Sequence, residues 1–215
     1  MSLALDAITF KYRGTTRPIL AEISLEVPSG TSVALMAPSG AGKSTLLSIA
    51  GLLLAPDSGS VAINGTRRSV RDGPVLLGKE VGWILQSVNL LARRSALDNV
   101  ALPRLARGAR RRNELSHAEE LLGAVGLHGD LQRPARKYSG GEAQRIGVAR
   151  ALMSSPAVLI ADEPTANLDL ATARDVARAL FGAARERTAL LIATHDEAIA
   201  SMADRVITLE TSAAL

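Results

Sequence analysis

Aliphatic and polar residues alternate along short stretches near the start of the chain. Between residues 19 and 27, Ile, Leu and Val alternate with Ser and Glu, and residues 3–10 have a similar β-rich character. This spacing predicts strands with one buried face. Residues 32–36 form a continuous apolar run, followed by a glycine-rich loop and a helix-like stretch at 43–54. The first part of the chain therefore predicts an antiparallel β region that leads into a strand, a loop and a helix.

The middle of the chain changes to a helical period. Strands are expected at 61–65 and 81–86, and residues 97–126 predict helices that are interrupted at Pro103 and Gly108. Within this region, Ser116-His117-Ala118-Glu119 matches a capping box, which predicts that a helix begins there.

Strands and helices alternate again in the last third of the chain. The expected elements are a helix at 141–153, a strand at 157–161, a helix at 171–187, a strand at 188–193, a helix at 196–202 and a strand at 205–209. Such alternation is typical of an α/β fold with a parallel sheet covered by helices. We expect one domain over residues 1–215, with a helical subdomain at about 88–150 inserted into it.

Composition narrows the class of protein. The chain has 215 residues, 47% of them hydrophobic and 21% charged, which favours a folded core over disorder. The absence of cysteine excludes disulfides, thiol catalysis and cysteine metal sites. Aromatic residues make up only 2% of the chain, too few for a stacking platform on single-stranded nucleic acid. The longest apolar run is too short to cross a bilayer, and the N-terminus lacks a basic signal region, so we expect a cytoplasmic protein.

A glycine-rich segment stands between the buried strand and the first helix. Glycines let backbone N–H groups approach phosphates, Lys43 can reach the β- and γ-phosphates, and Ser44 can bind Mg²⁺. Ala37 replaces the first glycine of the strict P-loop pattern, which removes conformational freedom where the loop begins. The alternative is an ordinary glycine-rich turn, but the flanking strand and helix favour a P-loop and hence a P-loop NTPase core. The residues expected to contact nucleotide here are Ser39, Gly40, Ala41, Gly42, Lys43, Ser44 and Thr45.

A P-loop requires an acid at the end of a neighbouring strand. Residues 157–161 are apolar and are followed by Asp162 and Glu163. Asp162 would hold the water shell of Mg²⁺, and Glu163 would act as general base on the attacking water. Because strand side chains alternate, the two acids are expected on opposite sides and need not share a role.

One further motif points to a family. The segment Tyr138-Ser139-Gly140-Gly141-Glu142-Ala143-Gln144-Arg145 resembles the signature of ATP-binding cassette (ABC) transporter ATPases, which usually have Leu where Tyr138 stands. Ser139, Gly140 and Gly141 would open a helix whose N-terminus attracts anions. The resemblance implies that these residues and Glu142 close on ATP held by another subunit, so that a homodimer forms around two ATP molecules.

The resemblance implies roles for four more residues. Gln86 resembles the family's glutamine that contacts Mg²⁺ and the water, and Asp169 resembles the acid in the loop that contacts the opposing subunit. His195 resembles the switch histidine that contacts the γ-phosphate, and Tyr12 resembles the aromatic that stacks on adenine. Taken singly, Gln86, His195 and Tyr12 each have a structural alternative, namely a surface glutamine at a strand end, a satisfied structural histidine and a core aromatic.

Less specific features of the sequence resemble those of the lipoprotein-release and macrolide-export subfamily. They are Asn167, the segment 96–103 and the lack of an additional C-terminal domain. The resemblance implies a Mg²⁺-dependent ATPase that is peripheral to the cytoplasmic face of the membrane. It would drive a separate transmembrane permease through a groove at 86–103 and would bind no nucleic acid. Arg107 and the run 110–112 could face anionic headgroups or simply form a solvated surface.

Three alternatives remain open at this point. The first is a non-transport ABC ATPase that acts on nucleic acid or the ribosome, although such proteins usually fuse two cassettes. The second is a cassette that binds ATP without hydrolysing it, against which Glu163 and His195 both argue. The third is a P-loop small-molecule kinase, which would leave the signature segment unexplained.

Overall fold

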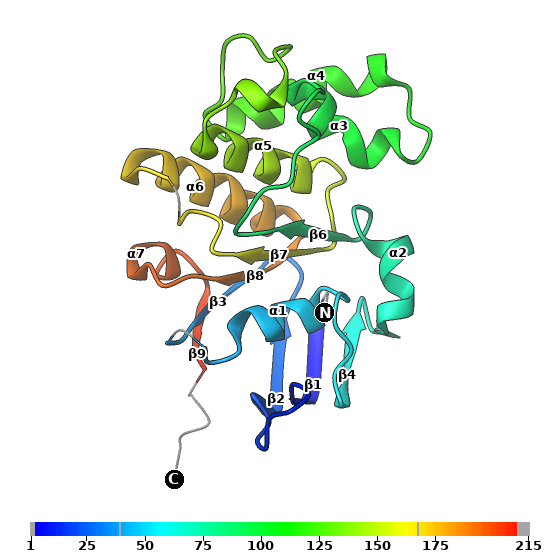
Figure 1. The fold of residues 1–215 in the computed structure, drawn as a ribbon, viewed down its shortest axis with the longest axis vertical. Coiled ribbons are helices and arrows are strands. Elements are labelled where there is room, and N and C mark those ends of the chain that lie inside the picture. Colours follow the sequence, from blue (N-terminus) through cyan, green and yellow to red (C-terminus); the bar gives the residue numbers. More distant parts are fainter. Residues whose placement is uncertain (1–2, 39, 167, 210–215) are drawn as a thin grey trace.

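The computed structural model describes residues 3–38, 40–166 and 168–209 and contains two sheets (Figure 1). The first sheet is antiparallel, with strand order β2-β1-β4-β5, and the second is parallel, with strand order β6-β7-β8-β3-β9. The antiparallel strands are β1 (Leu3–Phe10), β2 (Leu20–Val27), β4 (Ser58–Ile63) and β5 (Thr66–Arg68). The parallel strands are β3 (Ser32–Met36), β6 (Val81–Ile84), β7 (Val158–Asp162), β8 (Ala189–Ala193) and β9 (Arg205–Thr208). The expected α/β class is confirmed.

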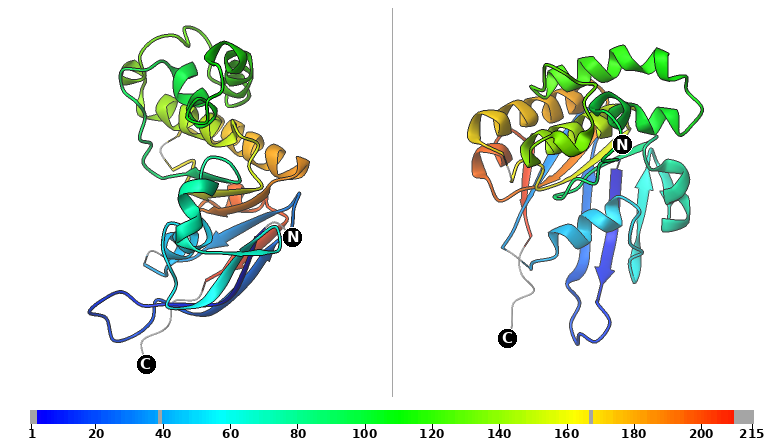
Figure 2. Two further views of the ribbon diagram at one scale, coloured as in Figure 1. Left: turned by 90° about the vertical axis from the view of Figure 1, so that its right-hand side faces the viewer. Right: turned by 45° about the horizontal axis from the view of Figure 1, so that its top comes forward.

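Helices cover both faces of the parallel sheet. The helices are α1 (Lys43–Ala50), α2 (Gly73–Leu76), α3 (Ala96–Leu105), α4 (Arg111–Ala124), α5 (Gly140–Leu152), α6 (Leu170–Glu186) and α7 (Glu197–Ala200), with 3₁₀ turns at Val70–Asp72 and Ala135–Lys137. Helix α1 packs on β7 and β8 between the two sheets, whereas α5 packs on β6, and α6 packs on β8 from the other side. Helices α3, α4 and α5 contact one another and form a layer at one end of the molecule (Figures 1 and 2).

Alternating side chains of the parallel strands divide between two cores. Val33 and Leu35 of β3 face a core shared with α1 and the antiparallel sheet, whereas Ala34 faces a core shared with α5, α6 and the helical layer. Both cores contain fully buried aliphatic side chains. Because the apolar residues of β3 contribute to one core or the other, the loop that follows β3 starts from a rigid base.

Two expectations about the helical layer are wrong. Pro103 lies inside the last turn of α3 and does not end it. The φ of proline is close to the helical value, so the helix loses one N–H donor but can continue for two more residues, while Val100 and Ala101 hold it by burial. Ser116 lies inside α4, which begins earlier, at Arg111. The buried pair Ala118 and Leu122 fixes this helix, so the local capping-box match does not set its start.

Candidate functional site

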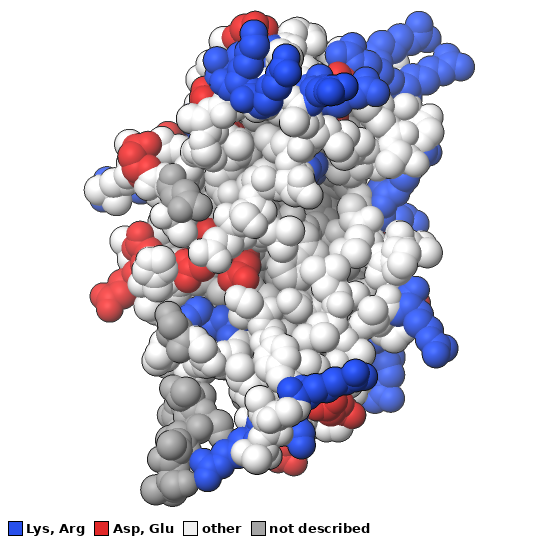
Figure 3. Space-filling view, viewed as in Figure 1, with Lys and Arg blue, Asp and Glu red and all other residues white. Residues whose placement is uncertain are grey.

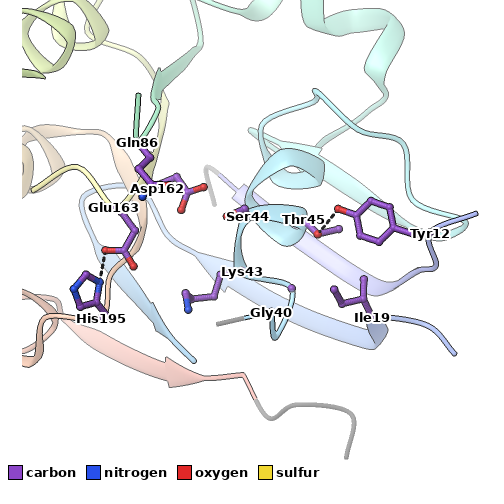
Figure 4. A pocket seen from close by; sticks show the side chains of 11 residues that line it. Tyr12, Ile19, Gly40, Lys43, Ser44, Thr45, Gln86, Asp162, Glu163 and His195 are labelled. Carbon is purple, nitrogen blue, oxygen red and sulfur yellow. Dashed lines mark hydrogen bonds and ion pairs between the residues drawn. The ribbon is translucent and has the colours of Figure 1, made fainter. Parts of the chain in front are cut away.

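A cavity of about 540 Å³ lies at the carboxyl ends of parallel strands β6, β7 and β8, beside the loop that follows β3 (Figure 4). Ligands gather at this edge in open α/β sheets. The cavity is lined by Tyr12, Ile19, Gly40, Gly42, Lys43, Ser44, Thr45, Gln86, Asp162, Glu163 and His195. Apart from Ile19, every one of these residues is a candidate from the sequence, and the fold brings them together from five separate segments.

The loop before α1 has the backbone of a phosphate cradle. Gly40 and Gly42 have φ of 82° and 89°, which L-residues with a side chain rarely adopt. A Cβ on Gly40 would meet no heavy atom within 4 Å, so the space beside it is open to a ligand. Gly42 is the N-cap of α1 and supplies no side chain to cap it, so the first N–H groups of this helix can bind an anion.

Lys43 lies across the mouth of the loop. Its Nζ donates hydrogen bonds to the carbonyl oxygens of Ala37 and, at 3.3 Å, of Pro38. The left-handed residues of the described loop are Gly40 and Gly42, and Ala37 is not among them. The Ala37 departure from the strict pattern therefore causes no backbone strain.

The two acids line the same cavity, contrary to the expected alternation. Asp162 is the last residue of β7, and Glu163 has a left-handed φ of 47° that turns the chain directly after the strand. The Glu163 N–H donates to the carbonyl oxygen of Ala193 at 3.0 Å, which fixes this turn against the end of β8. Such a conformation is costly for a residue other than glycine and concentrates at functional sites. The prediction that the two carboxylates lie on opposite sides is wrong, because β7 ends at Asp162 and the alternation of strand side chains does not extend to Glu163.

Glu163 and His195 are in direct contact. His195 Nδ1 lies 2.9 Å from Glu163 Oε2, and the His195 side chain is 72% exposed while that of Glu163 is 13% exposed. The largely buried carboxylate is thus held at the cavity by a hydrogen bond to a mostly exposed histidine (Figure 4). Residues at the ends of neighbouring strands supply both groups.

Three residues that carry side-chain oxygen atoms, Ser44, Gln86 and Asp162, line the cavity together. Hydroxyl, amide and carboxylate oxygens suit Mg²⁺, which is usually held by few protein groups and completes its shell with waters and phosphates. Among the described residues, no group of three or more His, Cys, Asp or Glu could hold a metal ion. The donor set therefore fits a magnesium ion that arrives with a phosphorylated ligand.

Apolar groups form the end of the cavity nearest the antiparallel sheet. Tyr12 is 47% exposed, its ring packs edge-on against Phe10 at 5.0 Å, and its hydroxyl bonds Thr45 Oγ1 at 2.8 Å. Its exposure rules out a purely core role. Ile19 lies close by (Figure 4) and is not predicted as a site residue, because an isoleucine at the start of an apolar strand pattern indicates only the core.

Three sets of candidates lie elsewhere. Ala41 is buried and does not line the cavity. Ser139 and Glu142 form a capping box at the start of α5, in which Glu142 Oε2 accepts from the Ser139 N–H at 2.8 Å. Asp169 caps α6 by accepting from the N–H groups of Ala171 and Thr172. The residues Ser139, Gly140, Gly141, Glu142 and Asp169 are absent from the cavity lining.

Two candidates, Ser39 and Asn167, lie outside the described residues. No helix in the described part of the chain is both long enough and apolar enough to span a membrane.

Comparison with known proteins finds a matching family model, similar sequences and similar solved structures. A family model described as "ABC transporter" matches residues 20–166. The lipoprotein-releasing system ATP-binding protein LolD of Cereibacter sphaeroides is 47% identical over 97% of this chain and 96% of its own length. LolD of Nitrobacter hamburgensis is 44% identical over 91% of this chain and 86% of its own. The dimeric post-hydrolysis structure of the ATP-binding cassette MJ0796, bound to ADP and Pi, aligns with a TM-score of 0.88 at 30% identity, covering 97% of this chain and 94% of that one.

Proposed function

The chain belongs to the ABC transporter family of ATP-binding proteins, and we propose that it is the ATPase subunit of a lipoprotein-releasing system. In this proposal it lies on the cytoplasmic face of the membrane and drives a separate permease. The names of the similar LolD proteins support lipoproteins as the transported class, because the residues that line the cavity fit a nucleotide and not a transported substrate.

The observation that carries the proposal is the division of the candidate residues into two sets. The cavity gathers the phosphate loop, the acids and His195, whereas Ser139 to Glu142 lie at the start of α5 and outside its lining. The glycine N–H groups at this helix N-terminus can bind an anion. The anion must come from outside the copy that contains this helix, because the cavity of that copy does not include it. Two copies arranged head to tail would let α5 of one copy close on ATP held by the other, consistent with the dimeric form of MJ0796.

In this proposal most residues of the cavity have a chemical task. Lys43 and the N–H groups at the start of α1 neutralise phosphate charge, which is the main means of catalysis in phosphoryl transfer. Glu163 accepts a proton from the attacking water, and His195 holds the Glu163 carboxylate and lies where it can reach the γ-phosphate. Tyr12 and Ile19 offer an apolar surface to the adenine ring.

Magnesium, held by Ser44, Gln86 and Asp162, would neutralise charge on the β- and γ-phosphates. Gln86 follows β6 in the chain, with one residue, Leu85, between them, and its side chain is exposed. It therefore links the metal to the surface on which a permease would act.

The alternative of a nucleic-acid or ribosome partner gains no support from the comparisons. The basic run is also less available than its sequence indicates. Arg107 donates to the carbonyl oxygen of Gly78 at 2.7 Å, and Arg111 pairs with Asp98. Basic side chains do gather over the helical layer, while acidic ones lie nearer α6 and α7 (Figure 3). Arg107 and Arg111 therefore make contacts within the chain that stabilise the fold.

The test of hydrolysis is Glu163→Gln. The amide keeps the shape of the side chain but cannot accept the proton, so turnover should fall by about 10²–10⁴-fold while ATP binding persists. ATP should then hold the variant as a stable dimer in size-exclusion chromatography. Glu119→Gln, an exposed substitution on α4, is the matched control and should hydrolyse ATP like the native protein. Native turnover in Glu163→Gln would remove the role given to this residue.

The transport partner is tested by capture. The Glu163→Gln variant, held closed with ATP and Mg²⁺, is used to purify bound proteins from detergent-solubilised membranes. A permease with few membrane spans and a large extracytoplasmic domain is the expected result. Recovery of ribosomes or nucleic acid without a membrane protein would overturn the proposal.

A further inference from the structure

The residue before the signature serine takes part in a contact network that the motif does not explain. The Arg133 guanidinium lies over the Tyr138 ring, 3.9 Å from its centroid. The Tyr138 hydroxyl donates to the carbonyl oxygen of Asp130 at 3.0 Å, which ties the ring to the preceding loop. A stacked guanidinium is attracted by the face of an aromatic ring, and an aliphatic side chain at position 138 could not attract it in this way.

Arg133 also pairs with the capping residue of α5. Its Nη2 lies 2.6 Å from Glu142 Oε1, while the other carboxylate oxygen accepts from the Ser139 N–H at 2.8 Å. In return, Ser139 Oγ accepts from the Glu142 N–H at 3.3 Å. The hydrogen bond from the Ser139 N–H, the Ser139 hydroxyl and the charge of Arg133 together hold the pKa of Glu142 below its ordinary value against the effect of burial. Glu142 is therefore ionised, and its negative charge stands in the first turn of the helix.

An ionised carboxylate at this place conflicts with binding a phosphate. The N–H groups of Gly140 and Gly141 and the hydroxyl of Ser139 attract an anion, but the charge of Glu142 repels it. The Arg133 guanidinium cancels that charge at close range and holds the carboxylate against Ser139. The stacked Tyr138 ring restricts the guanidinium to this position.

We propose that Arg133, held by Tyr138, is a positioning residue for the α5 half of the ATP site, and that it keeps this helix start receptive to the γ-phosphate by neutralising Glu142. This inference rests on the proposed function, in which α5 of one copy closes on ATP bound to the other. Arg133 acts through Glu142 and Ser139 and contacts no reacting atom in this role.

The experiment measures ATP-dependent dimerisation of the Glu163→Gln protein by analytical ultracentrifugation, with and without Arg133→Ala. The ion pair is partly exposed, so its loss should weaken the dimer by about fivefold rather than by the full value of a buried pair. Binding of a fluorescent ATP analogue to the monomer should not change, because the cavity does not include Arg133. The defect should shrink as salt screens the repulsion.

A second pair of variants separates charge from packing. Glutamine can replace glutamate in a capping box, so Glu142→Gln keeps the geometry and removes the charge. In that background, Arg133→Ala should have no further effect on dimerisation. Arg133→Lys should restore part of the affinity, and Arg178→Ala, which breaks the exposed pair with Asp175 on α6, should change nothing.

The outcomes are distinct. An equal loss from Arg133→Ala with and without the Glu142→Gln substitution, or no loss in either case, overturns the proposal. Failure of Glu163→Gln itself to dimerise with ATP would count against the proposed function instead. Thermal unfolding of each variant identifies any that lose dimerisation by failing to fold, and Tyr138→Leu then provides the test in place of Arg133→Ala, with the same expected dependence on Glu142.

Discussion

Gly42→Ala tests why the phosphate loop needs glycine at the start of α1. Gly42 has φ of 89° and Gly40 has φ of 82°, so a side chain at either position carries a backbone cost. A Cβ on Gly42 would lie 2.9 Å from Leu20 Cδ2 and 3.3 Å from the carbonyl oxygen of Ile19. A Cβ on Gly40 would meet no heavy atom within 4 Å. Both substitutions strain the backbone, and only Gly42→Ala also crowds the start of β2.

The two contributions have different magnitudes. A left-handed backbone costs an L-residue about 1–2 kcal/mol. Crowding adds about 1 kcal/mol, which is at the low end of overpacking costs because the end of the Leu20 side chain can rotate away. A cost remains because the backbone oxygen of Ile19 cannot rotate away. We expect Gly42→Ala to lose about 2–3 kcal/mol of unfolding free energy and Gly40→Ala about 1–2 kcal/mol. Domains are stable by about 5–15 kcal/mol, so both variants should fold.

Urea unfolding followed by tryptophan fluorescence measures this difference. Trp83 is the single tryptophan and lies half-buried in β6, with its Nε1 donating to the carbonyl oxygen of Gly51 at 3.1 Å. Equal losses in the two variants would refute the crowding argument. The methyl group of Gly40→Ala should enter the cavity and weaken ATP binding beyond its effect on stability. Native ATP affinity in Gly40→Ala would show that this side of the loop does not face phosphate.

Three further outcomes are expected. Lys43→Ala should abolish detectable ATP binding in a fluorescence titration, and unchanged affinity would contradict the P-loop assignment. Ala37→Gly should leave ATP affinity within about twofold of native, because Ala37 is not left-handed, and a clear tightening would contradict that reasoning. The pKa of Glu142 is lowered from 4.5 chiefly by the Ser139 N–H, so Glu142→Gln should cost stability above about pH 4.5. The difference in unfolding free energy should vanish as the pH falls through the lower folded-state pKa, and a constant difference from about pH 6 to pH 3 would contradict the stated cause.

Periodicity and turn chemistry were sufficient to predict most of the fold. The parallel strands are short apolar runs bounded by turns, so their positions follow from local composition. The helical layer was harder to predict because burial there overrides local signals. Pro103 continues a helix that Val100 anchors, and Ser116 lies within a helix that Leu122 fixes from the other end.

The cavity residues could be predicted for a related reason. Carboxyl ends of parallel strands meet at one edge, so acids or histidines that directly follow apolar runs converge there. Asp169 stands just before a predicted helix, which is a signal for the cap that the structure shows. In contrast, the left-handed turn at Glu163 has no sequence signal, since glutamate rarely adopts it. The stacking of Arg133 on Tyr138 depends on how a loop folds back, which periodicity does not predict.

The starts of α1 and α5, which the proposed dimer would bring to one ATP, differ in how their N–H groups are capped. Helix α1 has no side-chain cap, so its first N–H groups are free to bind phosphate in a single copy. Helix α5 uses Ser139 and Glu142 to cap itself, and only part of its anion-binding capacity is left. Phosphate should therefore bind α1 first, and α5 should add its contribution only when a second copy brings the phosphate to it. In the proposed dimer, the difference in capping makes ATP binding precede dimer closure.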